Sequence, residues 1–412
     1  MPPESWNSIA LGEYAKVIMG QSPESDYYTT NPNDTPFLQG NRTFGSKYPA
    51  FDTYTSKITK LAPTGSVIIS VRAPVGDTNI APVELCLGRG VAALSSNDPD
   101  NEFLYYLMKY LAPVLNQNEN GSTFGSINRS DLENLQLILP DSESRIKIGR
   151  ILSLLDGKIE LNRAINDNLF KMLESEYNNI SDNYPGEIEL SSLCHIVKDK
   201  ISSNGLTINN YYSTENMLPN KAGVIPAASL PLGGKVTHCA EGDVLISNIR
   251  PYFKKIHYCS CVSGCSADVL CFRSKKEDYS PYLYSILRSD DFFDYAVAGS
   301  KGTKMPRGDK KQIMQYMIPN PPKDVLDSFN IISKGILSTI SNNCRLSQQL
   351  VCMRDFIIPK LMSNEIDIST LRLPAKYSFS ILLGHILLMC ILYILLIDHC
   401  IMKRCINSHM SQ

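Results

Sequence analysis

The stretch nearest to a catalytic motif is Asn320, Pro321, Pro322 and Lys323. Enzymes that methylate the amino group of adenine use Asn-Pro-Pro followed by an aromatic residue, which stacks on the flipped base, and here Lys323 occupies the aromatic position. The stretch also falls where a strand is expected to join a helix, and Pro is common at the start of a helix. We therefore predict that it is a helix start and not an active site.

Other motifs for catalysis or metal binding are also incomplete. The sequence has no G-x-x-x-x-G-K-[ST] loop, and Gly233, Gly234 and Lys235 lack both its spacing and its hydroxyl. Four cysteines are close in sequence but lack paired C-x2-C spacing, which favours free thiols over a zinc site: Cys259, Cys261, Cys265 and Cys271. His238 and His257 lie in expected strands, as surface residues or as core residues whose hydrogen bonds are satisfied. The chain is predicted to have no catalysis and no metal of its own.

Two long segments are predicted to form helices. Residues 142–180 contain no Pro and have an apolar stripe with heptad spacing, and Asp141 or Ser142 can cap their start. Residues 323–363 have a similar stripe. The stripe positions are Ile148, Leu152, Leu155, Ile159, Asn162, Asn166, Leu169 and Leu173 in the first segment, and Ile332, Ile336, Ile340, Asn343, Ser347 and Leu350 in the second. They fit either two helices on separate cores or two helices packed on each other. We favour the second, with Asn162 and Asn343 setting the register.

The two halves of the chain repeat each other. Gly65-Ser-Val-Ile-Ile-Ser70 matches Gly242-Asp-Val-Leu-Ile-Ser247, and Arg129 and Asp131 match Arg307 and Asp309. The repeat predicts two globular domains, each followed by a long helix. The predicted segments are residues 1–140 (domain), 141–183 (helix), 184–322 (domain), 323–365 (helix) and 366–412 (a tail of different composition).

This layout resembles the specificity subunit of type I restriction–modification systems. The resemblance covers roughly residues 5–370 and rests on GSVIISVRAPVG and GDVLISNIRPYFKK, on the loops GSTFGSINRSDL and GSKGTKMPRGDK, and on the two helical segments. It implies an α+β fold with two similar target-recognition domains, whose long helices pair as an antiparallel coiled coil.

The resemblance also implies a function and partners. The chain would be a non-catalytic cytoplasmic subunit that reads a two-part target in double-stranded DNA. Its partners would be two modification subunits, which bind S-adenosylmethionine, and two restriction subunits, which use ATP and magnesium. With 40 Lys and Arg against 41 Asp and Glu, contacts with phosphate must come from local patches or be shared with partner subunits.

Arg, Lys, Asn, Gln, Ser and Tyr side chains beside strands and in Gly-rich loops are the candidates for DNA contact. In the first domain they are Gln39, Asn41, Arg42, Lys47, Tyr48, Arg72, Ser126, Asn128 and Arg129. In the second they are Ser247, Asn248, Arg250, Tyr252, Lys254, Lys255, Lys301, Lys304 and Arg307. For Arg129 and Arg307, a local ion pair with Asp131 or Asp309 is an equally good interpretation.

The tail departs from the resembled family. Residues 381–397 are apolar except for His385, and with their neighbours they approach the roughly 20 residues that cross a bilayer. The segment is either a real membrane anchor or the product of a gene fusion or frame shift, and we favour the latter. The anchor would fit a different function, a membrane-anchored protein whose duplicated domains bind a protein or a glycan.

Overall fold

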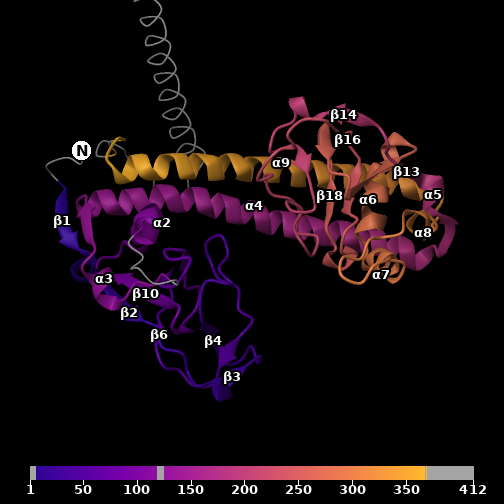
Figure 1. Cartoon of the computed structure of the whole chain (residues 1–412). Coiled ribbons are helices and arrows are strands. Elements are labelled where there is room, and N and C mark those ends of the chain that lie inside the picture. The colour runs from indigo at the N-terminus through magenta and orange to yellow at the C-terminus, as the bar shows by residue number, and fades with distance from the viewer. Residues whose placement is uncertain (1–5, 118–124, 367, 369–412) are drawn as a thin grey trace, which may run out of the picture. The chain divides into compact units, whose positions relative to one another are not determined.

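The computed structural model describes residues 6–117, 125–366 and 368, which form a mixed α/β structure (Figure 1). The chain divides into two compact units. The first unit runs to Ile159 and includes the residues from Gln349 onward, and the second is Glu160–Gln348. The two long helices, α4 (Ser142–Asn183) and α9 (Lys323–Met362), each contribute residues to both units.

The first unit is built on an antiparallel sheet with the order β2-β10-β7-β8. Its strands are β2 (Ala15–Met19), β7 (Val67–Ser70), β8 (Thr78–Ile80) and β10 (Val91–Ser96). All four residues of β7 are buried, which explains the continuous β-branched run in the sequence. Helix α2 (Asn101–Gln117) packs on this sheet, and β1 (Asn7–Ala10) pairs with β11 (Gln136–Leu139) beside it.

A second, mixed sheet completes the first unit, with the order β3-β5-β4-β9-β6. Its strands are β3 (Tyr28–Thr29), β4 (Thr35–Leu38), β5 (Tyr54–Thr55), β6 (Leu61–Ala62) and β9 (Leu85–Leu87). The short helices are α1 (Leu11–Tyr14), η1 (Ser25–Tyr27) and α3 (Arg129–Glu133). Side chains of both sheets, including Leu38, Ile68, Leu85 and Leu87, form one core.

The second unit repeats the main sheet of the first. Its order β13-β20-β17-β18 corresponds strand for strand to β2-β10-β7-β8. These strands are β13 (Cys194–Ile196), β17 (Val244–Ser247), β18 (Ile256–Tyr258) and β20 (Val269–Ser274), and β12 (Gly186–Glu189) pairs with β21 (Met317–Pro319) beside them. The helices are α5 (Leu190–Leu193), α6 (Ser280–Arg288), α7 (Asp290–Ala298) and α8 (Lys310–Met314). The matched sequence motifs therefore lie on matched strands.

The remaining sheet of the second unit has a different order, β14-β16-β19-β15. Its strands are β14 (Lys200–Ser202), β15 (Tyr211–Tyr212), β16 (Lys235–Cys239) and β19 (Ser263–Cys265). Short 3-10 turns are η2 (Ser203–Gly205), η3 (Pro251–Phe253) and η4 (Glu277–Tyr279). The two units thus share one sheet and differ in the other.

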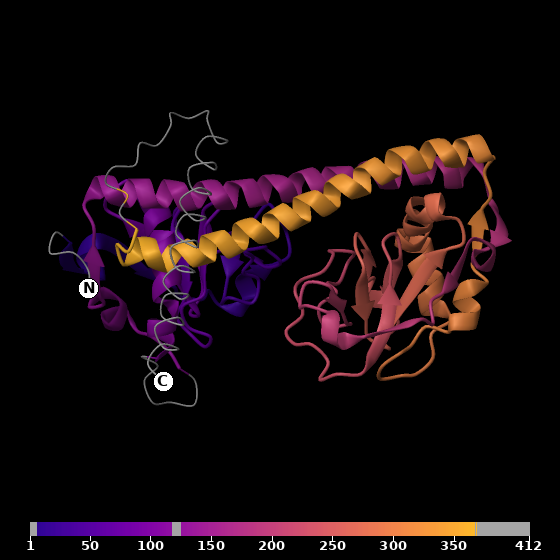
Figure 2. The ribbon, with the colours of Figure 1, turned by 90° about the horizontal axis from the view of Figure 1, so that it is seen from above.

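Within the second unit, α4 and α9 lie side by side and are joined by buried amides (Figure 2). Asn162 Nδ2 donates to Ser347 Oγ at 3.1 Å and to the Asn343 carbonyl at 3.5 Å. The Asn343 side chain, however, donates to Asn166 Oδ1 at 2.8 Å. The amide-to-amide bond of Asn343 is therefore made with Asn166, one turn from Asn162.

One stripe position predicted from the sequence is wrong. Ile332 is 52% exposed, whereas Ser333 and Ile336 are buried. An α-helix turns about 100° per residue, so at this end of α9 the buried side is centred near Ser333 and Ile332 falls beside it. The buried positions keep alternating steps of four and three residues through Phe329, Ser333 and Ile336, whereas Ile332 lies four residues before Ile336 and so falls outside that spacing.

Within the first unit, the same two helices are joined to α2 by a buried ionic group. Asp156 Oδ1 accepts from Arg354 Nη1 at 2.6 Å, and Asp156 Oδ2 accepts from the Tyr106 hydroxyl at 2.6 Å. The Asp156 and Arg354 side chains are only 5% and 11% exposed. At the start of α4, Asp141 Oδ1 caps the backbone N–H of Ser144, as its position before the helix predicts.

The cysteines in the described part of the chain are free thiols. Cys259, Cys265 and Cys271 are buried in an apolar core of the second unit, and Cys261 is exposed. Among the described residues there is no group of His, Cys, Asp or Glu side chains arranged to hold a metal ion. The apolar segment 381–397 lies outside the described residues, and none of the helices that are described has the length and apolarity of a membrane span.

Candidate nucleic-acid interface

The candidate residues of the first unit come from three segments that meet beyond the ends of β7 and β8; we call this the first loop surface. Arg72 forms an antiparallel bridge with Ser126, and Ile127 N donates to the Val71 carbonyl. Residues 39–48 are fastened to the same place, since the side chain of buried Asn79 bonds both the N–H and the carbonyl of Gly45 at 3.0 Å. The fold therefore gathers positions up to ninety residues apart in the sequence.

Side chains of the first loop surface differ in how far they are already engaged. Gln39, Tyr48, Arg72 and Ser126 are exposed, and no hydrogen bond or ion pair of their side chains is found within the described residues. Several other candidates bond to neighbouring side chains: Asn41 with Asp77, Arg42 with Asp52, and Arg129 with Glu133. Lys47 is buried, its ammonium facing the Tyr48 ring at 5.4 Å. The exposed set is the better placed to contact a ligand.

The second unit has an equivalent second loop surface, formed by residues 247–255 and 301–307. Arg250 N donates to the Pro306 carbonyl at 2.7 Å, and Gly308 N donates to the Asn248 carbonyl at 3.1 Å. Ile249 and Arg307 form an antiparallel bridge, just as Arg72 and Ser126 do in the first unit. The repeat thus preserves the way in which the Gly-rich loop is attached to the main sheet.

Basic side chains of the second loop surface are held by acidic groups and carbonyls. Lys254 Nζ lies 2.7 Å from Asp290, and this hydrogen bond raises the pKa of Lys254. Lys255 Nζ donates to the Thr214 carbonyl, and burial lowers its pKa. Lys304 and Tyr252 are exposed. Ser247 is buried, and its hydroxyl donates to the Ile249 carbonyl at 3.0 Å, so it shapes the turn instead of facing a ligand.

The predicted local pairing of Arg129 with Asp131, and of Arg307 with Asp309, is wrong. Asp131 is engaged with Asn128 in a capping box at the start of α3, and Arg129 pairs with Glu133 one turn later at 2.7 Å. Asp309 caps α8 and pairs with Lys301 at 2.5 Å, while Arg307 pairs with Asp268 at 3.0 Å. Both Asp residues cap the start of a short helix, Asp131 as the third residue of α3 and Asp309 as the residue before α8.

Two features of the second unit escaped the sequence reasoning. Phe253 follows Tyr252 at the exposed tip of the 247–255 turn, although only Tyr252 was predicted to contact DNA. His257, in β18, has a buried Nε2 with no hydrogen-bond partner among the described residues, and desolvation lowers its pKa to about 4. Its ring lies 4.6 Å from that of Tyr212, and its Nε2, unpartnered within the described part of the chain, differs from the predicted core histidine whose hydrogen bonds are satisfied.

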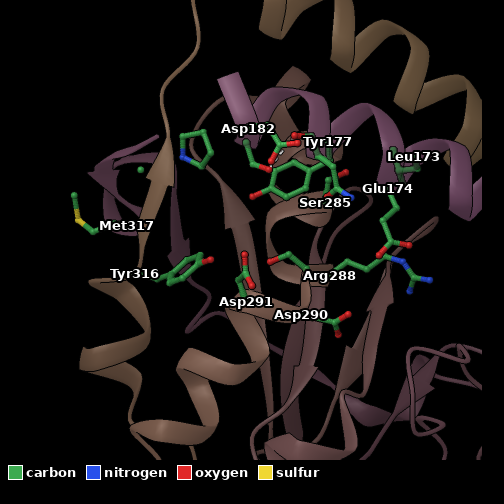
Figure 3. A pocket seen from close by; sticks show the side chains of 15 residues that line it. Leu173, Glu174, Tyr177, Asp182, Ser285, Arg288, Asp290, Asp291, Tyr316 and Met317 are labelled. Carbon is green, nitrogen blue, oxygen red and sulfur yellow. Dashed lines mark hydrogen bonds between the residues drawn. The ribbon is translucent and has the colours of Figure 1, made fainter. Parts of the chain in front are cut away.

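A pocket of about 480 Å³ in the second unit is chemically different from the loop surfaces (Figure 3). It is lined by the end of α4, the junction of α6 and α7, and β21. Its charged lining residues are Glu174, Asp182, Arg288, Asp290 and Asp291. Four carboxylates against one guanidinium would repel phosphate groups. We therefore leave this pocket out of the candidate nucleic-acid interface.

Comparisons with known proteins point to one family. Residues 3–170 match the family described as the type I restriction modification DNA specificity domain. The MjaX type I restriction enzyme specificity subunit of Methanocaldococcus jannaschii is 41% identical over 173 residues, which are 41% of this chain and 41% of that protein. The MjaIX specificity subunit of the same organism is 24% identical over 427 residues, with 90% of this chain and 95% of that protein covered.

A solved structure supports the same fold over most of the chain. The S subunit of a type I restriction–modification system from M. genitalium superposes with a TM-score of 0.57 at 16% identity, covering 86% of this chain and 96% of that one. The match to MjaX spans only about two fifths of either protein. None of these comparisons supports the alternative of a membrane-anchored chain that binds a protein or a glycan.

Proposed function

We propose, from the premise that this chain belongs to the family of type I restriction–modification specificity subunits, that it reads a two-part sequence in double-stranded DNA. The first and second loop surfaces would each read one part. The chain would direct the chemistry and not perform it.

The observation that carries the proposal is the repeated construction of the two loop surfaces. In each unit an Arg follows the central buried strand, and the Gly-rich loop is tied to it by backbone hydrogen bonds: Arg72 with Ser126, Ile249 with Arg307. Exposed Arg, Lys, Gln and Tyr side chains on a rigid edge are the groups that contact phosphates and base edges. A rigid edge with such side chains fits a groove of DNA better than it fits a small-molecule ligand.

We further propose that residues 1–140 and 184–322 are target-recognition domains, and that α4 and α9 pair as an antiparallel coiled coil that spaces them. Supporting this, Asn162 bonds Ser347 while Asn166, further along α4, accepts from Asn343, earlier on α9. Buried Asn residues in an apolar seam favour a single register. A spacer of fixed length would leave an unread gap between the two parts of the target.

The partners and cofactors of this proposal follow from the family. Two modification subunits, which bind S-adenosylmethionine, would dock on the helix pair to methylate adenine. Two restriction subunits would use ATP and magnesium to cleave unmodified DNA. The assembly would work in the cytoplasm, and the chain described here would supply only its choice of sequence.

Co-expression with a modification subunit of a type I restriction–modification system tests the proposal. Genome-wide mapping of methylated adenines should reveal one motif in two parts with a constant gap. Exchanging residues 1–140 for those of a relative should change one part and leave the other part and the gap intact. A soluble complex that methylates no defined motif would refute the DNA-reading function.

A further inference from the structure

We infer that residues 248–255 form a rigid wedge whose Tyr252 and Phe253 rings enter the base stack of the DNA. The inference rests on the proposed function and adds a mode of recognition to it: the second recognition domain would distort its half of the target, and the first would not.

The backbone of the turn is held in an unfavourable conformation. Arg250 and Lys254, which flank η3, have φ values of 51° and 49°, in the left-handed region that non-glycine residues rarely adopt. Asn220 and Lys221 opposite them have φ values of 56° and 59°. Each such residue destabilises the folded chain, and strain of this kind persists only where the surrounding structure holds it, which is typical of functional sites.

Neighbouring residues hold this turn in its strained conformation. Asn220 N donates to the Phe253 carbonyl at 2.8 Å, and Lys221 N donates to the Lys254 carbonyl at 2.9 Å, so the second strained pair is bonded to the end of the turn. Asp290, in the first turn of α7, receives both Lys221 Nζ at 2.9 Å and Lys254 Nζ at 2.7 Å. The turn is therefore braced from two sides and cannot fold back over its own side chains.

The exposed tip of the turn carries two aromatic rings. Tyr252 and Phe253 are 48% and 37% exposed, and their ring centroids lie 4.7 Å apart. Lys255 Nζ lies 5.8 Å from the centroid of the Phe253 ring, and Arg250 leads into the turn from the other side. Two adjacent rings, each partly exposed, therefore lie beside cationic side chains on a strained and braced turn.

DNA supplies the chemistry that such a tip fits. Apolar side chains that enter between base pairs unstack them and kink the duplex, while basic neighbours hold the backbone. An aromatic ring can stack on any of the bases, because every base has a π-face. In the first unit Val75 follows Pro74 where Tyr252 follows Pro251, and Val75 is buried. No ring stands at the matched position there, so the distortion should be confined to one half of the target.

The test uses the full chain in complex with its modification subunits. The probe is a duplex that carries the mapped methylation motif, with 2-aminopurine placed in turn at base steps of each half away from the methylated adenine and its neighbours, because the modification subunits would flip that adenine in either half. Its fluorescence rises when the base is unstacked. The variants are Tyr252→Ala, the double variant Tyr252→Ala/Phe253→Ala, and Tyr110→Ala as a control, because Tyr110 is an aromatic residue of equal exposure to Phe253, 37%, on α2.

Wild type and Tyr110→Ala should raise the fluorescence in the half read by residues 184–322 and not in the other half. The double variant should assemble normally, lose that rise and bind the motif about tenfold more weakly or worse. Tyr252→Ala, the milder change, should show part of both effects with an unchanged melting temperature, which separates loss of the wedge from misfolding.

Two results would overturn the wedge and leave the proposed function standing. The first is a double variant with an unchanged fluorescence rise and unchanged affinity. The second is a double variant that no longer binds the modification subunits, which would place the two rings in a protein interface. A wild-type complex that binds no duplex would instead refute the proposed function, and this inference with it. The two failures are therefore distinguishable.

Discussion

Replacing Asp156 by Ala should destabilise the first unit more than any surface substitution. Its carboxylate receives Arg354 Nη1 and the Tyr106 hydroxyl, both at 2.6 Å, and joins α4 to α9 and to α2. The Asp156 and Arg354 side chains are almost wholly buried. The Ala variant would leave a guanidinium and a hydroxyl in the interior without their acceptor.

The size of the effect follows from these contacts. Removing one partner of a buried ion pair lowers the free energy of unfolding by about 3–5 kcal/mol, because the remaining charge stays buried without its counter-charge. Arg354 keeps Asp355 at 2.7 Å, a half-exposed carboxylate, so the lower end applies and we expect about 3 kcal/mol. Replacing both partners with Asp156→Ala/Arg354→Met removes the orphan charge. The loss of unfolding free energy in the double variant should therefore be about 2 kcal/mol smaller than the sum of the losses in the two single variants.

Urea unfolding followed by Trp6 fluorescence measures the effect. Trp6 is the single tryptophan of the sequence and belongs to the first unit, so its signal reports that unit. Asp355→Ala, which removes the exposed partner of Arg354, is the matched control and should change the free energy of unfolding by less than about 1 kcal/mol. Additive single effects, or a loss below about 1 kcal/mol for Asp156→Ala, would show that the buried pair does not hold the helices.

Three further perturbations test other parts of the structure. Asn343→Leu should lower the free energy of unfolding by about 1–3 kcal/mol in urea titrations followed by circular dichroism, because it strands the buried Asn166 amide, and Asn166→Leu/Asn343→Leu should recover most of the loss. Burial lowers the pKa of His257 to about 4 in the folded chain, below its unfolded value, so the folded chain binds fewer protons than the unfolded chain. The free energy of unfolding should therefore fall by up to about 1.4 kcal/mol per pH unit as the pH drops from 6.5 towards 4, and the decline should be shallower in His257→Phe. Arg72→Ala in the complex should reduce the salt dependence of DNA binding by about one phosphate contact, and Arg42→Ala, whose guanidinium is already paired, by less; equal slopes for both would argue against a phosphate contact at Arg72.

The long helices were predictable because their cause is local. An uninterrupted heptad spacing and a capping residue at Asp141 predict a helix that starts near residue 142, and the structure has α4 from Ser142 to Asn183. The partner of each buried Asn was less accessible. It depends on the relative shift of the two helices, which the spacing within either helix does not contain. The sequence repeat aligns Asn162 with Asn343, yet the amide of Asn343 bonds Asn166.

For the loop surfaces, the sequence predicted which segments come together but not the contacts of each side chain. Residue types predicted which segments are polar and exposed, and the fold does gather them, but the state of each side chain depends on neighbours distant in the sequence. Lys47 reads as an exposed cation and is buried, and Arg307 pairs with Asp268, which no local pattern links to it. Backbone strain at Arg250 is also invisible in composition, since Arg has no preference for a left-handed turn.

The differences between the units bear on how such a chain changes its target. The main sheets correspond strand for strand, and both attach a Gly-rich loop after the central strand, whereas the second sheets have unlike strand orders. In the first unit residues 39–48 are attached through Asn79 of β8; in the second, Asn220 and Lys221 brace the tip of the 248–255 turn. Each loop surface is therefore completed by elements that the repeat does not share. If the proposed function holds, exchange of these elements alone, on an unchanged main sheet and helix pair, should alter the half-site read without altering the gap.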